Sequence, residues 1–110
     1  MSPEAQRIAI AEACGWTEIS DWGAGGINGK HPTGPWVEVI PDYLNDLNAM
    51  HDAVKTLLQN MKPRYFSCLC AVVSGAISLK GYSEATEATA AQRAEAYLRT
   101  IGKWVGADDR

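Results

Sequence analysis

Aromatic and basic side chains suited to binding a small anion gather around a glycine-rich segment, residues 22–35. Trp22 begins the segment, Lys30 and His31 lie within it, and Trp36 follows it. Indole rings stack on nucleotide bases, and cationic side chains attract phosphate oxygens. Five glycines and two prolines favour a loop or an irregular hairpin here. We therefore predict a loop, either a flap beside a pocket for a small anionic nucleotide or a variable surface loop.

Two arginines of the predicted last helix, Arg93 and Arg99, would complete such a pocket. Arg93 falls in the first turn of that helix, where the helix dipole disfavours a positive charge. An ion pair with Asp46, another acidic neighbour or an anionic ligand would compensate for this. The structural ion pair is the default interpretation.

The tryptophans also have a structural interpretation. Trp16 and Trp36 are large enough to fill much of a small core, and Trp104 could cover the end of the last helix. Four tryptophans in 110 residues is a high number, and tryptophan is enriched in binding interfaces. The sequence leaves the core and pocket interpretations open.

No arrangement typical of an enzyme or a metal site is found. Gly29 and Lys30 are followed by a histidine and a proline, so the segment lacks the serine or threonine that ends a phosphate-binding loop. His51 is expected on or beside an apolar helix stripe, without a catalytic partner. The spacing of Asp42, Asp46 and Asp52 matches no calcium loop. We predict a non-enzymatic protein with no catalytic residues, metal or cofactor.

Composition points to one domain over residues 1–110. The formal net charge is −3 and no block of basic residues occurs, which disfavours general nucleic-acid binding. The longest apolar run, Leu69–Val73, is too short to cross a bilayer, and the N-terminus lacks a secretion signal. We therefore expect a cytoplasmic protein with no membrane partner. The three cysteines lie in apolar contexts and are expected to be structural thiols: Cys14, Cys68 and Cys70.

Helical spacing and capping signals predict most of the fold. Ser2 and Pro3 are typical of a helix start, and Thr89 with Gln92 fits a capping box. Thr86 offers a competing start for the last helix. The predicted elements are helices at 3–14, 43–59 (opened by Pro41 and Asp42) and 89–102, with short strands at 17–22 and 36–40.

Residues 64–74 fit either a helix or a strand, and Pro63 as a helix starter favours the helix. A short strand is expected at 76–82. The apolar stripe that begins at Leu44 is expected to pack against Tyr97 and Ile101 of the last helix. These elements predict a small sheet with three or four helices, an α+β fold rich in helix.

Three segments resemble parts of the phage ABA sandwich domain family. They are Ile8–Trp16, similar to its first helix and Gly-Trp turn, Pro41–Lys55, similar to the start of its long helix, and Thr86–Trp104, similar to its closing helix. The resemblance covers a little under half of the chain. It implies a phage or prophage origin, a location in the host cytoplasm and an α-β-α sandwich, a sheet held between helices. The family has no settled activity to carry over.

Two functional hypotheses follow. The first is a binding protein that counters host defence by sequestering a small cyclic nucleotide immune signal, and that forms a homo-oligomer because a symmetric interface adds pocket surface. The alternative is a protein–protein interaction module, either a phage structural accessory or a direct inhibitor of a host protein. An exposed apolar patch around Trp104 or residues 64–73 would favour the alternative.

Overall fold

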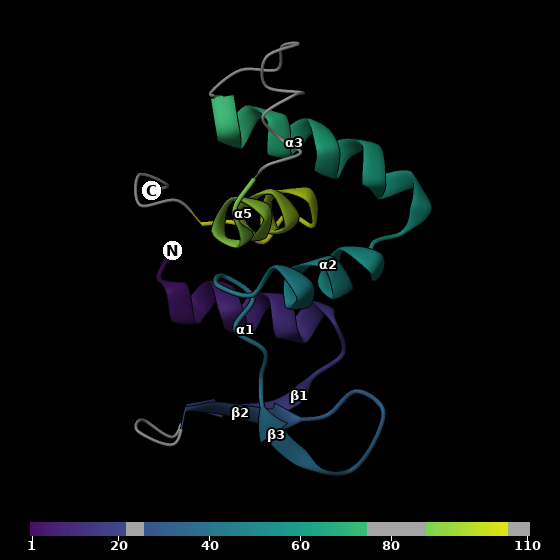
Figure 1. The fold of residues 1–110 in the computed structure, drawn as a ribbon. Coiled ribbons are helices and arrows are strands. Elements are labelled where there is room, and N and C mark those ends of the chain that lie inside the picture. Colours follow the sequence, from purple (N-terminus) through teal and green to yellow (C-terminus); the bar gives the residue numbers. More distant parts are fainter. Residues whose placement is uncertain (22–25, 75–87, 106–110) are drawn as a thin grey trace.

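The computed structural model describes residues 1–21, 26–74 and 88–105 (Figure 1). These residues form four α-helices, a short 3-10 helix and a three-stranded antiparallel sheet, which confirms the predicted α+β class. In chain order the elements are α1 (Pro3–Ala13), β1 (Thr17–Asp21), β2 (Ile27–Lys30), β3 (Val37–Val39), α2 (Leu47–Lys55), η2 (Gln59–Met61), α3 (Lys62–Ser74) and α5 (Ala90–Thr100).

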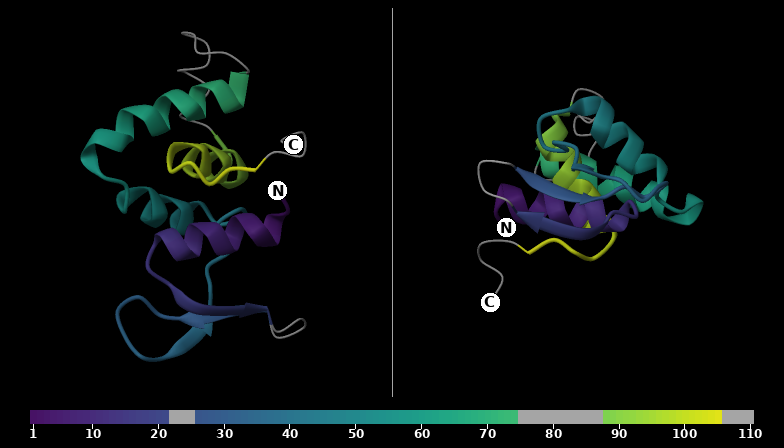
Figure 2. Two further views of the ribbon diagram at one scale, coloured as in Figure 1. Left: turned by 180° about the vertical axis from the view of Figure 1, so that it is seen from behind. Right: turned by 90° about the horizontal axis from the view of Figure 1, so that it is seen from below.

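The elements are stacked in a consistent order of layers. The sheet lies at one end of the molecule, α1 and α2 follow, α5 lies in the middle, and α3 covers the far side of α5 (Figure 1). The view from behind in Figure 2 shows the same order. The described helices therefore lie to one side of the sheet, whereas the resemblance implied helices on both sides.

The central helix, α5, begins as predicted. The Thr89 hydroxyl accepts a hydrogen bond from the Gln92 backbone N–H at 3.1 Å, and the Gln92 side chain accepts one from the Thr89 N–H at 2.9 Å. This reciprocal capping box satisfies two N–H groups that would otherwise be unpaired. The competing start at Thr86 lies outside the described residues.

Small residues allow α5 to be covered on several sides. Ala94 and Ala96 point in different directions around the helix, yet both are fully buried, as are the larger Tyr97 and Leu98. α3 forms the most extensive contact with α5, and α1 and α2 contact it as well. The second helix contacts the last, as predicted, and the Oγ1 of Thr56, at the end of α2, lies 2.9 Å from the Tyr97 hydroxyl.

The second helix is shorter than the predicted span of 43–59. Asp46, rather than Asp42, caps it: one Asp46 carboxylate oxygen accepts hydrogen bonds from the Asn48 and Ala49 N–H groups at 2.9 and 3.2 Å. The Asp46 N–H bonds to the Asp42 carbonyl at 2.9 Å, so residues 42–46 form a separate turn. Because this turn has helix-like spacing, Leu44 still packs against the core and extends the apolar pattern.

The other helices follow the predictions more closely. α1 covers most of the predicted span 3–14, and the Ser2 hydroxyl caps it by accepting from the Ala5 N–H at 3.1 Å. Residues 64–74 are helical, within α3, which confirms the preferred reading of that segment. The strand expected at 76–82 lies outside the described residues.

The sheet has the order β1-β2-β3, and both neighbouring pairs are antiparallel. The strand expected at 17–22 is present as β1 over its described residues, and the strand expected at 36–40 is present in shorter form as β3. Residues 27–30 of the segment predicted as a loop or an irregular hairpin form the central strand, and this strand pairs with β3 as a hairpin. The hairpin alternative therefore holds for these residues, and the loop alternative does not. A Cβ on Gly29 would lie 3.0 Å from Ile19 Cγ1 and 3.3 Å from Ile40 Cγ2. Glycine here allows the neighbouring isoleucines to pack on the inner face.

The Arg7 side chain links the end of the sheet to α1. The Arg7 guanidinium of α1 donates hydrogen bonds to the carbonyls of Ile40 and Pro41, the residues that follow β3. Ile40 is itself buried in the core. The end of the sheet is therefore tied to α1 by both polar and apolar contacts.

The buried phenol of Tyr97 makes the free energy of unfolding decrease at alkaline pH. Burial raises the Tyr97 pKa from its usual 10.0 to about 12, against the opposing effect of the hydrogen bond with Thr56. Burial likewise raises the pKa of Tyr43. The phenols lose their protons at a lower pH in the unfolded chain than in the folded protein. Their contribution to stability is therefore complete below pH 10 and declines as the pH rises toward the folded pKa.

We predict that Tyr97→Phe lowers the free energy of unfolding by about 1 kcal/mol at pH 8, the typical value of one hydrogen bond. Above pH 10 the variant should lose stability less steeply than the original protein, because one buried phenol is gone. Urea unfolding between pH 8 and 11.5 measures both quantities. Parallel pH profiles of the two proteins would contradict this assignment.

Candidate functional site

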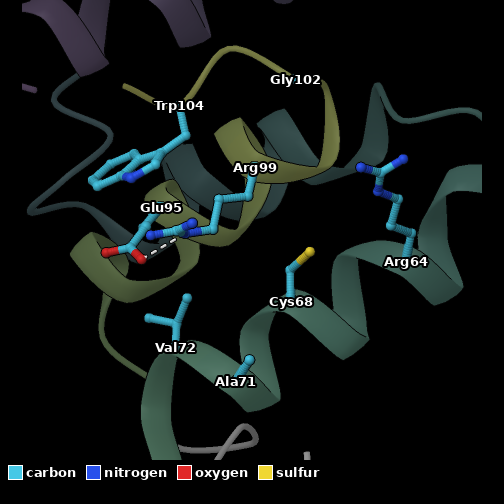
Figure 3. A pocket seen from close by; sticks show the side chains of 8 residues that line it. All are labelled: Arg64, Cys68, Ala71, Val72, Glu95, Arg99, Gly102 and Trp104. Atoms are coloured by element: carbon cyan, nitrogen blue, oxygen red, sulfur yellow. Dashed lines mark hydrogen bonds and ion pairs between the residues drawn. The ribbon is translucent and has the colours of Figure 1, made fainter. Parts of the chain in front are cut away.

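A pocket with a volume of about 610 Å³ lies between α3 and α5 (Figure 3). This volume falls within the range of about 300–1,000 Å³ that is usual for small-molecule sites. We call it the α3–α5 pocket. Its lining residues are Arg64, Cys68, Ala71, Val72, Glu95, Arg99, Gly102 and Trp104.

The end of α5 positions Trp104. Gly102 has a φ of +75°, and the backbone bonds Gly102 N–H to Arg99 O (3.3 Å) and Lys103 N–H to Leu98 O (2.8 Å) form a Schellman motif. This motif turns the chain back along the helix, and the Arg99 Cζ lies 5.2 Å from the centre of the Trp104 ring. At this distance the guanidinium and the indole form a cation–π contact.

Glu95 fixes the other side of the Arg99 guanidinium. The Arg99 Nε donates to the Glu95 carboxylate at 2.8 Å, one turn back along α5. In Figure 3 the Arg99 side chain extends toward both Glu95 and Trp104. Arg99 therefore presents an oriented cation at this end of the pocket.

Arg64 supplies a second cation at the other end of the pocket (Figure 3). It is exposed, and within the described residues no hydrogen bond or ion pair engages its side chain. Arg64 lies near the beginning of α3, so its charge adds to the positive end of the helix dipole. Between the two arginines, Cys68, Ala71 and Val72 form a largely apolar floor.

A different cluster lies at the sheet end of the molecule. The His31 ring stacks on Trp36, with centroids 4.9 Å apart, and meets the edge of Trp16 at 5.1 Å. The His31 N–H bonds to the Trp36 carbonyl at 2.9 Å and closes the turn between β2 and β3. A Cβ on Gly34 would lie 1.8 Å from the Trp36 ring, so glycine at this position makes room for the stack.

The polar contacts of His31 orient its ring in this turn. Its Nδ1 lies 2.8 Å from the Thr33 hydroxyl and accepts the Thr33 backbone N–H at 3.1 Å. Its Nε2 lies 4.0 Å from Glu38, beyond hydrogen-bond range. The backbone N–H and the hydroxyl of Thr33 both approach His31 Nδ1. This geometry is typical of a turn and not of a histidine that activates a nucleophile.

A second pocket, of about 470 Å³, adjoins this cluster between α2 and the turn. Trp16 and His31 line it together with the carboxylates of Asp46 and Asp52, and its lining contains neither lysine nor arginine. This pocket therefore suits an anion less well than the α3–α5 pocket.

The structure separates the residues of the predicted pocket. His31 and Trp36 meet in the stack, and Lys30 ends β2, half-buried and paired with Val37. Trp22 lies outside the described residues. Arg99 lies in the α3–α5 pocket, beyond α1 and α2 from the sheet (Figure 1).

Arg93 has neighbours of its own. Its Nε donates to the Ala88 carbonyl at 3.0 Å, and its charge favours ionisation of the Tyr65 hydroxyl, whose pKa burial raises overall. Asp46, suggested from the sequence as its ion-pair partner, instead caps α2. His51, expected beside the apolar stripe, is exposed.

Sequence reasoning missed Arg64 and Glu95 as members of the site. The spacing of Glu95 and Arg99, four residues apart on a helix, was a readable signal for their ion pair. Arg64 gave no such signal, because its place in the pocket depends on how α3 packs against α5.

The described residues contain neither a candidate metal cluster nor a membrane-spanning helix. No three histidine, cysteine, aspartate or glutamate side chains in these ranges cluster closely enough to hold a metal ion. None of the helices in the same ranges has the length and apolar character needed to span a membrane.

Comparison of the chain with protein-family models, with curated proteins and with solved structures found no match. The resemblance to the phage family therefore stays a prediction.

The Schellman motif that positions Trp104 can be tested through Gly102. No atom lies within 4 Å of a Cβ built at this position, so the cost of a side chain there comes from the backbone alone. We predict that Gly102→Ala lowers the free energy of unfolding by about 1 kcal/mol, while Gly102→Asn costs less because asparagine tolerates left-handed φ. Urea unfolding gives both values, and equal losses would contradict the proposed cause.

Proposed function

We propose that the protein binds a small anionic nucleotide in the α3–α5 pocket and does not act on it chemically. The observation that carries this proposal is the pairing of an unengaged cation, Arg64, with the oriented Arg99–Trp104 group across an apolar floor. A nucleotide combines the two features that such a pocket can recognise, a charged phosphate and a flat aromatic base.

The charges of the pocket support an anionic ligand. Arg64 and Arg99 outnumber Glu95, which leaves one positive charge in excess among the lining side chains. A guanidinium can hold two phosphate oxygens through parallel hydrogen bonds. Arg64 forms no ion pair with a described residue, so binding a phosphate there breaks no existing interaction.

The aromatic group supports a ligand with a base. Trp104 is half-buried and held by Arg99, so little side-chain freedom is lost when a base stacks on it. Stacking of a base on an aromatic side chain contributes roughly 1–3 kcal/mol. Arg64 and Trp104 come from opposite ends of the pocket, an arrangement that matches a ligand with separate phosphate and base (Figure 3).

The lining residues favour binding over catalysis. Among the described residues no histidine lines the α3–α5 pocket, and the one carboxylate that does, Glu95, is engaged by Arg99. In the biological form of the proposal, the protein sequesters a cyclic nucleotide immune signal in the cytoplasm of a phage host. That form depends on the resemblance to phage proteins as well as on the pocket.

Isothermal titration of the intact protein with cyclic dinucleotides, cyclic trinucleotides and cyclic ADP-ribose isomers tests the proposal. We predict saturable binding of at least one class, and about tenfold or greater weakening by Arg64→Gln, which removes a charge-assisted contact. Lys62→Gln is the matched control, since Lys62 is an exposed cation of α3 that does not line the pocket. Absence of binding to every class would refute the proposal.

Tryptophan substitutions locate the ligand within the molecule. We predict that Trp104→Ala weakens binding of the ligand found by titration about tenfold, in line with a lost stacking contact. Trp36→Ala should leave the affinity unchanged, because Trp36 lies in the histidine stack at the sheet end. If Trp36→Ala weakens binding and Trp104→Ala does not, the ligand binds at the sheet end instead, next to Lys30 and His31.

A further inference from the structure

The outer edge of β3 is the most exposed apolar feature of the described sheet. β3 is a terminal strand in the order β1-β2-β3, so within the part of the chain that the structure describes one side of its backbone has no neighbouring strand. Val37 and Val39 are 55% and 54% exposed, and the preceding Trp36 is 47% exposed. Large apolar side chains on an uncovered strand favour pairing with another chain.

The hydrogen-bond pattern shows which backbone groups face outward. The Trp36 carbonyl and the Ile40 N–H bond toward β2, to His31 and Ile27 respectively. In an antiparallel pair such residues alternate with residues whose N–H and C=O point away. Val37 and Val39 therefore direct two N–H and two C=O groups to the free edge.

The opposite edge of the sheet differs. The pairing of β1 with β2 is interrupted between Thr17 and Ser20, and Glu18 has a φ of 51°. Such irregularity typically protects an edge from further pairing. β3 has a regular register with β2 instead, and Pro35 and Pro41 confine its outward-facing stretch to residues 37–39.

We propose that the β3 edge binds an extended segment of another protein as an added antiparallel strand, with a basic residue between two apolar ones. With Val37 and Val39 hydrogen-bonded to the added strand, Glu38 occupies a non-hydrogen-bonded position, where opposing side chains are closest. The Glu38 side chain is 53% exposed, and the His31 Nε2 lies 4.0 Å from its carboxylate. A lysine or arginine opposite Glu38 complements its charge.

A second copy of this chain fits the edge less well. Pairing residues 37–39 of two copies would place the two Glu38 carboxylates directly opposite each other, which is unfavourable. Sliding the register by two residues in either direction would bring Pro35 or Pro41, which lack an N–H, against an outward-facing valine. The facing Glu38 carboxylates and the two prolines therefore favour a different protein over a second copy of this chain.

The test uses two blocked five-residue peptides, Thr-Val-Lys-Val-Thr and Thr-Val-Glu-Val-Thr, titrated into the isotopically labelled full-length protein. We expect the lysine peptide to shift the backbone amide signals of Val37 and Val39 saturably, and the glutamate peptide to bind about fivefold or more weakly. Glu38→Lys should reverse this preference without removing any backbone hydrogen bond. An unchanged preference, or no shift at these amides with either peptide, would overturn the proposal.

A backbone variant provides a second readout. Val39→Pro removes one outward N–H that β2 does not use, and we expect it to abolish the shifts caused by the lysine peptide. Val39→Thr, which keeps the N–H and the branched side chain, is the matched control and should still bind. Sedimentation of the free protein as a dimer that Val39→Pro dissociates would instead assign the edge to a second copy and overturn the proposal.

Discussion

Burial of α5 on several sides is the constraint on which the rest of the structure depends. Each of the other described helices contacts this one, and its alanines allow their backbones to approach. The N–H groups of its first turn and the C=O groups of its last turn have no partner within the helix, so residues at each end must satisfy them. The Thr89–Gln92 capping box does this at one end and the Schellman motif does it at the other.

The same helix also builds the candidate site. Arg99 and Glu95 project from the part of α5 that α3 leaves accessible, and the reversal at Gly102 adds Trp104 to them. A structural requirement, the termination of a buried helix, thus brings an indole ring against a guanidinium. The site therefore needs no loop of its own to be positioned.

Local signals in the sequence predicted the elements whose ends are marked by side chains. The Ser2 cap and the Thr89 capping box were readable because each involves residues three apart in the chain. The start of α2 was misplaced because the turn before Asp46 keeps helical spacing, so the periodicity continues across a boundary. The sequence does not predict β2 as a strand, because glycine ordinarily disfavours strands. Gly29 is nevertheless required in β2 by the close approach of Ile19 and Ile40. For the candidate site, the sequence predicts Arg99 as a ligand-binding residue and an exposed apolar patch around Trp104. It does not predict Arg64 as a ligand-binding residue, because Arg64 reaches the pocket through the packing of α3 against α5.

The contact between Cys14 and Tyr97 joins positions 83 residues apart in the chain. α1 and α5 pack against each other, so this contact can form only after the last helix has been synthesised. At ribosomal elongation rates of about 5–20 residues per second, the delay is roughly 4–17 s. During biosynthesis the emerging N-terminal half therefore exposes Ile10 and Ala11 for seconds, an interval in which a chaperone can engage them.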